Sequence, residues 1–95
     1  MGNVYKLIAK VKELREDGGT GPCPMYEVGQ EFDLSKPEEK EKICKWAYHT
    51  MFPFLAILEF DGTIPWEPDP NKGLISCPDP HRVVVFEIRR EIKNH

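Results

Sequence analysis

The chain has 95 residues, of which 40% are hydrophobic and 31% are charged, and its formal net charge is -3. These values are typical of one globular domain, which we expect to span residues 1–95. So small a net charge gives no reason to expect binding to nucleic acid or to an anionic membrane surface. The longest apolar run, Met51–Leu58, has eight residues, far fewer than a helix needs to span a bilayer.

The first segment, Val4–Leu14, is compatible with either a strand or a helix. Its lysines alternate with apolar residues as in a strand, yet its aliphatic residues also fit one face of a helix. We favour a strand because no capping residue precedes Val4 and a glycine-rich turn follows at residues 17–22. Residues 26–32 are expected to form two short extended pieces joined by a turn at Gly29.

Ser35 is predicted to begin the first helix. Its spacing to Glu38 is that of a capping box, and Pro37 suits the first helical turn because a missing N–H costs nothing there. The helix should continue to about His49, because Pro53 ends or kinks it at the preceding residues.

A second short helix is expected over Phe54–Glu59. Apolar residues lie on almost every side of the helical stretch 43–60, so this stretch should be covered on more than one side. A small sheet can cover only one side. The proline-rich loop at residues 64–70, a second subunit or a partner would have to supply the rest.

The last part of the chain is predicted to be extended. Leu74–Cys77 reads as a short strand. In residues 83–92, one face of a strand would carry Val84, Phe86, Ile88 and Ile92, and the other Glu87, Arg89 and Glu91. If this last strand lies antiparallel to the first, the lysines of the first strand face Glu87 and Glu91 in pairs that contribute up to about 1 kcal/mol each. The sequence therefore predicts an α+β domain: a small antiparallel sheet with one kinked or two consecutive helices packed on one face.

Three cysteines from separate segments are the first candidates for chemistry. Cys23, Cys44 and Cys77 could bind zinc or an iron–sulfur cluster if folding gathers them, with His81 or His49 as a further ligand. The chain has no Cys-x-x-Cys pair, so the pattern is weak, and inert packing of the thiols is the alternative. An odd number of cysteines and an N-terminus without the features of a secretory signal indicate a reduced, cytoplasmic protein.

Other residues could contribute to a site. Cys23, which follows the flexible glycine-rich turn, and Cys77 are candidates for a nucleophilic thiol. Trp66, set among prolines, could form the wall of a ligand pocket. Asp79 could orient a histidine ligand from its position between two prolines.

Several spaced motifs also resemble those of a known family. They are Cys23-Pro-x-x-x-Val-Gly-x-x-Phe32, Cys44 with Tyr48 and Pro53, Gly62-x-x-Pro-Trp66, and Cys77-Pro-Asp-Pro80 before a Val-Phe-Glu-Ile strand. From about Val4 to Arg90, the chain is similar to small, functionally uncharacterised prokaryotic proteins whose hallmark is the closing Cys-Pro-Asp-Pro. The resemblance implies no activity, but it groups the cysteines, Gly29, Pro65, Trp66 and the Pro78-Asp79-Pro80 corner into one pattern. Such proteins often have Gly-His where this chain has Met25-Tyr26, which argues against a histidine ligand beside Cys23.

We therefore expect a small cytoplasmic binding or accessory protein, forming a homo-oligomer or a complex with a protein partner. Its site would be lined by cysteines and hold a metal or a small ligand. The expected metal ligands are Cys23, Cys44, Cys77 and His81, and the expected ligand-binding residues are Trp66, Asp79 and His49. The alternatives are an enzyme with a reactive cysteine nucleophile and a structural subunit of an oligomer or larger complex.

Overall fold

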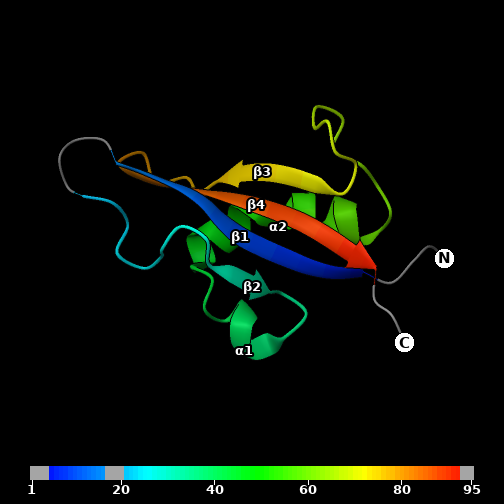
Figure 1. Ribbon diagram of the computed structural model, residues 1–95, viewed down its shortest axis with the longest axis horizontal. Helices are drawn as coiled ribbons and strands as arrows, with labels where there is room; N and C mark the ends of the chain where they lie inside the picture. The colour runs from blue at the N-terminus through cyan, green and yellow to red at the C-terminus, as the bar shows by residue number, and fades with distance from the viewer. Residues whose placement is uncertain (1–4, 17–20, 93–95) are drawn as a thin grey trace.

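The computed structural model describes residues 5–16 and 21–92. In chain order its elements are β1 (Tyr5–Glu16), β2 (Glu31–Asp33), α1 (Pro37–Lys40), α2 (Lys45–Glu59), β3 (Lys72–Ser76) and β4 (Arg82–Ile92). The strands form one antiparallel sheet in the order β2-β1-β4-β3, and α2 lies behind it in Figure 1, against one face. The α+β architecture is the one predicted. None of the described helices is both long and apolar enough to cross a membrane.

The N-terminal segment is a strand, as favoured above, and it pairs with two others. β1 hydrogen-bonds to β2 on one side and to β4 along almost its whole length on the other. The predicted turn at Gly29 is present, with a φ of 98° that a residue lacking Cβ adopts without strain. Of the two short extended pieces expected around this turn, only the one after it, β2, is a strand.

The core lies between the sheet and α2. Because side chains alternate along a strand, every second residue of β4 points to the helix. The helix contributes one face, on which Ala47, Met51, Leu55 and Leu58 are buried. The clustered buried side chains are Leu7, Ala9, Val11, Tyr26, Phe32, Ile43, Ala47, Met51, Leu55, Leu58, Ile75, Val84, Phe86 and Ile88.

The opposite face of the sheet carries the predicted charged pairs. Lys6 lies 3.7 Å from Glu91, and Lys12 lies 3.4 Å from Glu87. A bulge near the middle of β1 shifts the register between these two pairs. All four side chains are accessible to water to some degree, so the pairs favour this register more than they add to stability.

A glutamate engages each outer strand of the sheet. The backbone N–H of Asp33 in β2 donates to Glu39 Oε1 at 3.0 Å, and the N–H of Leu74 in β3 donates to Glu67 Oε2 at 3.0 Å. An outer strand with free N–H groups can pair with another chain. These two carboxylates occupy donors that such pairing would need.

The first helix is shorter than predicted. It ends at Lys40, and a non-helical segment separates it from α2. The predicted capping box of Ser35 with Glu38 does not form, since no side chain caps α1. The Ser35 hydroxyl donates instead to the Asp33 carboxylate, and Glu39 accepts the backbone N–H of Asp33. These bonds hold α1 beside the end of β2.

Pro53 lies inside α2, and the second helix expected at Phe54–Glu59 is the last part of this same helix. A proline removes one helical N–H and crowds the carbonyl four residues earlier, here that of His49. Both residues are exposed, so water can bond the freed carbonyl, while Met51 and Leu55 on the other side remain packed against the sheet. Tertiary packing therefore carries the helix through the proline.

The outer sides of α2 are covered only in part. Trp66 packs edge-on against Phe54, with ring centroids 5.9 Å apart, so the proline-rich loop covers one side as expected. Trp46, Phe52 and Phe60 remain 53%, 55% and 79% exposed. That a second subunit or a partner covers this surface stays a prediction, and sedimentation of the purified protein at several concentrations would test it.

Candidate functional site

The three cysteines converge on one buried tyrosine. Cys23 lies just before a turn, Cys44 immediately precedes α2, and Cys77 immediately follows β3. All three are free thiols, partly buried, and packed against the same core. The Tyr26 hydroxyl accepts the backbone N–H of Cys44 at 2.6 Å, and charge on any of the three sulfurs adds to the rise of the Tyr26 pKa. Folding thus places each of these thiols, which are far apart in the sequence, against the core on which Tyr26 lies.

Tyr26 is held as a neutral phenol. Burial raises the pKa of Tyr26, the N–H of Cys44 opposes this, and negative charge on the three thiols adds to the rise. The ring packs edge-on against Phe32 and Phe86, with centroids 5.9 and 5.4 Å away. The residue therefore fixes the start of α2 to the core.

The thiol of Cys77 closes the hairpin between β3 and β4. Its sulfur accepts the backbone N–H of Val84 at 3.2 Å and lies 3.6 Å from the carbonyl oxygen of Arg82. The backbone N–H of Cys77 in turn donates to the carbonyl of Val84 at 2.9 Å. The sulfur thus takes the place of a backbone acceptor at the end of the ladder, which is a structural role.

Asp79 shapes the turn of this hairpin. Its Oδ1 accepts the backbone N–H groups of His81 at 2.9 Å and of Arg82 at 3.1 Å, an arrangement typical of aspartate in turns. These bonds lower the pKa of the Asp79 carboxyl below its ordinary value. The residue expected to orient a histidine ligand has backbone partners instead.

Protonation of Asp79 should cost stability only in acid. Its folded pKa is lowered, so its contribution is complete above the ordinary value of 3.8 and is lost as the pH falls through the folded pKa. Asp79→Asn keeps an acceptor oxygen and should lose less stability than the wild type between about pH 5 and pH 2, whereas Asp79→Ala should be less stable already at neutral pH. Urea unfolding of the wild type and both variants, at neutral pH and across the acid range from about pH 5 to pH 2, measures these losses. An Asn variant as acid-sensitive as the wild type would contradict the assignment.

Nothing in the described part of the chain supports a metal centre at the cysteines and histidines. Among the described residues, no three His, Cys, Asp or Glu side chains form a group that could hold a metal ion, whereas zinc and iron–sulfur centres need four protein ligands in their closed forms. His49 and His81 are both exposed. Within the same residues no histidine hydrogen-bonds a cysteine sulfur.

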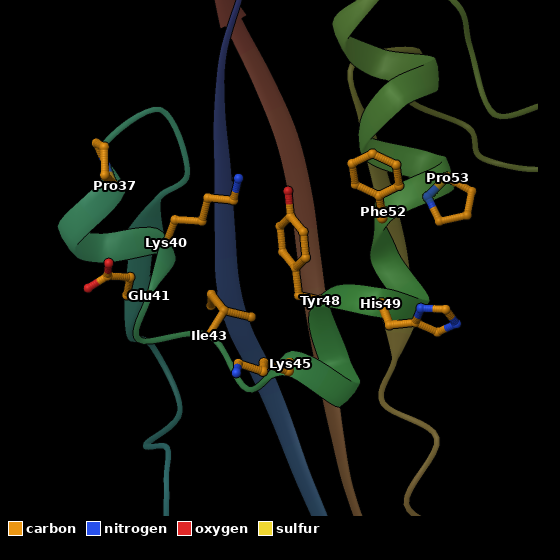
Figure 2. A pocket seen from close by; sticks show the side chains of 9 residues that line it. All are labelled: Pro37, Lys40, Glu41, Ile43, Lys45, Tyr48, His49, Phe52 and Pro53. Atoms are coloured by element: carbon orange, nitrogen blue, oxygen red, sulfur yellow. The ribbon is translucent and has the colours of Figure 1, made fainter.

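A groove of about 700 Å³ lies elsewhere, between α1 and the first half of α2 (Figure 2). This volume is in the range of small-molecule sites. Tyr48 and Phe52 stand side by side in the groove, with ring centroids 5.8 Å apart. The lining residues are Pro37, Lys40, Glu41, Ile43, Lys45, Tyr48, His49, Phe52 and Pro53.

Charged side chains lie around the apolar residues of this groove. The Lys40 amino nitrogen lies 5.1 Å from the centroid of the Tyr48 ring, a cation–π contact. In Figure 2 this amino group reaches toward Tyr48, whereas the Glu41 carboxylate points away from it. Neither lysine of the groove, Lys40 or Lys45, forms an ion pair with another described residue.

Of the predicted site residues, only His49 belongs to the groove. Trp66 is 67% exposed on the proline-rich loop and is not part of the lining. The groove exists because the chain breaks its helix between α1 and α2, which the sequence pattern did not reveal. The sequence did contain one indication, the apolar residues Tyr48 and Phe52 outside the sheet-facing side of α2.

Comparison with protein-family models, with curated proteins and with solved structures found no match for this chain. The resemblance to the family with the closing Cys-Pro-Asp-Pro motif therefore stays a prediction.

Proposed function

We propose that this chain is a small binding protein that holds an organic molecule in the groove between α1 and α2. The observation that carries the proposal is the groove itself, about 700 Å³ in volume with Ile43, Tyr48 and Phe52 among its lining residues. Phe52 is 55% exposed. A ligand that covers this surface gains about 25 cal/mol for each Å² of apolar area removed from water.

The cysteine cluster supports a binding function less well than the groove does. The sulfur of Cys77 is occupied by the N–H of Val84, and the Tyr26 hydroxyl is occupied by the N–H of Cys44. Polar groups that already have partners inside the protein are poorly suited to recognising a ligand. Their contacts are those of a packed junction between the hairpin and α2.

A neutral aromatic probe, naphthylmethanol, tests the proposal. Roughly 0.3 kcal/mol or more for each non-hydrogen atom gives a dissociation constant on the order of 1 mM or tighter. Titration of the probe should shift the backbone amide NMR signals of α1 and the first half of α2, while those of β3 and the hairpin turn stay in place.

The matched variants are Phe52→Ser and Phe60→Ser. Both phenylalanines are largely exposed on the outer side of the helix region, at 55% and 79%, so both variants should fold. Only Phe52 lines the groove. Phe52→Ser should weaken probe binding about fivefold or more, and Phe60→Ser should leave it unchanged. Equal affinities for the two variants would place the binding elsewhere.

A further inference from the structure

Building on the proposed function, we infer that the groove takes an amphipathic organic anion, a carboxylate attached to a flat apolar body. The presence of a groove alone does not determine the class of ligand. Two features of the lining carry it, its aromatic walls and its uncompensated lysines.

The walls favour a flat apolar body. Tyr48 and Phe52 are inclined at 49° with centroids 5.8 Å apart, and Figure 2 shows both rings standing from α2 on the side where Lys40 reaches in. Ile43 is buried, so it is fixed by the core. Rings in offset or edge-on contact gain about 0.5–1.5 kcal/mol beyond the burial of their area, so a planar ligand fits these walls better than a flexible one.

The charges favour a single negative charge on that body. The lining holds two lysines, one glutamate and the exposed imidazole of His49, and its lysines and glutamate together leave one net positive charge. The first turn of α2 carries no acidic side chain that would oppose an anion there. Lys40 already lies over the Tyr48 ring. Its amino group is therefore placed beside the aromatic side chains, where it can bind the negative charge of a ligand.

Glu41 does not cancel this field. Its carboxylate points away from Tyr48 in Figure 2, while the amino group of Lys40 points toward that ring. An anion stacked on Tyr48 therefore approaches Lys40 more closely than Glu41. The Coulomb energy falls with distance, and water screens the farther charge of Glu41. The nearer Lys40 therefore makes the net interaction of the groove with an anion attractive.

Three probes that share one ring system separate the charge effect from the apolar effect. Naphthoate is an anion, naphthylmethanol is neutral, and naphthylmethylammonium is a cation. We expect naphthoate to bind about three- to tenfold more tightly than the alcohol, as one partly exposed charge contact allows, and the ammonium to bind more weakly than the alcohol. All three should shift the same groove signals, and the advantage of naphthoate should shrink in high salt.

Lys40→Gln and Lys42→Gln form the matched pair of variants. Both lysines are exposed, but only Lys40 lines the groove. Lys40→Gln should remove most of the preference for naphthoate while the affinity for naphthylmethanol stays within about twofold, and Lys42→Gln should keep the preference. Equal affinities for the three probes, or tightest binding of the ammonium, would overturn the inference and leave the binding function standing. No binding by any of the three would overturn both.

Discussion

Replacing Arg90 by methionine should lower the free energy of unfolding by about 3 kcal/mol. The Arg90 guanidinium donates to the backbone oxygens of Leu58 at 2.9 Å and Gly62 at 2.7 Å, at the end of α2 and just after it. It also donates to the carbonyl of Pro70 at 3.2 Å and to Asn71 Oδ1 at 3.0 Å. Hydrogen bonds of charged groups contribute about 1.5–3 kcal/mol, and here one side chain ties the helix end and the following loop to β4.

Arg89→Met is the control for this prediction. The neighbouring arginine points to the other face of the sheet and pairs with Glu31 at 3.1 Å and Glu91 at 2.9 Å. Both carboxylates are well exposed, so the loss should be about 1 kcal/mol or less. Urea unfolding monitored by circular dichroism measures both variants. If Arg90→Met and Arg89→Met cost the same, Arg90 is not the tie between these elements.

Tyr26→Phe should lower the free energy of unfolding by about 1–2 kcal/mol. The change removes only the hydroxyl oxygen that accepts the N–H of Cys44 at 2.6 Å, and it leaves that donor without its partner at the start of α2. Tyr48→Phe is the matched control, because the Tyr48 hydroxyl forms no hydrogen bond with any residue in the described ranges. That variant should stay within about 0.5 kcal/mol of the wild type.

The Tyr26→Phe substitution should also change how much stability the protein loses in alkali. The pKa of Tyr26 is raised by burial, so the contribution of its protonated form is complete below the ordinary value of 10.0 and is lost as the pH rises through the folded pKa. Between about pH 9 and pH 11 the Tyr26→Phe variant should therefore lose less stability than the wild type. A variant with an unchanged alkaline loss would show that Tyr26 ionises as freely in the folded protein as in the unfolded chain.

The strands were largely predictable because their signals are local. In β4 the alternation that places Val84, Phe86 and Ile88 in the core is written directly in the sequence, and it also predicted the pairs of Lys6 and Lys12 with the glutamates of β4. β1 was ambiguous because its aliphatic residues satisfy two periods at once. Its pairing on both sides, a tertiary effect, decides in favour of the strand.

The predicted helix boundaries were wrong because tertiary contacts outweighed the local sequence rules. Pro53 normally ends a helix, but residues of α2 before and after it pack against the sheet and carry the helix past it. The expected capping box does not form because the hydroxyl and the backbone N–H of Ser35 both bond the Asp33 carboxylate, and Lys36 rather than Ser35 is the N-cap. The helix therefore begins one residue later than the spacing indicated.

The packing of the cysteines against the core was the alternative that the sequence offered, because free cysteines are often buried, but their individual roles could not be read from it. The sequence does not distinguish a cysteine whose sulfur accepts a backbone N–H, as Cys77 does from Val84, from a cysteine that binds a metal. The groove was missed because its two sides, α1 and the Tyr48–Phe52 side of α2, face each other only after the chain turns between them. Apolar residues outside the sheet-facing side of α2 were its one trace in the sequence.

Intermolecular nuclear Overhauser effects between naphthoate and the protein show whether the ligand lies in the groove. The account predicts contacts from the ring protons of naphthoate to the side chains of Ile43, Tyr48 and Phe52, which line the groove. Contacts confined to the surroundings of Tyr26 and the cysteines, or to the charged face of the sheet, would contradict it. So would the absence of any such contact when the protein is saturated with the probe.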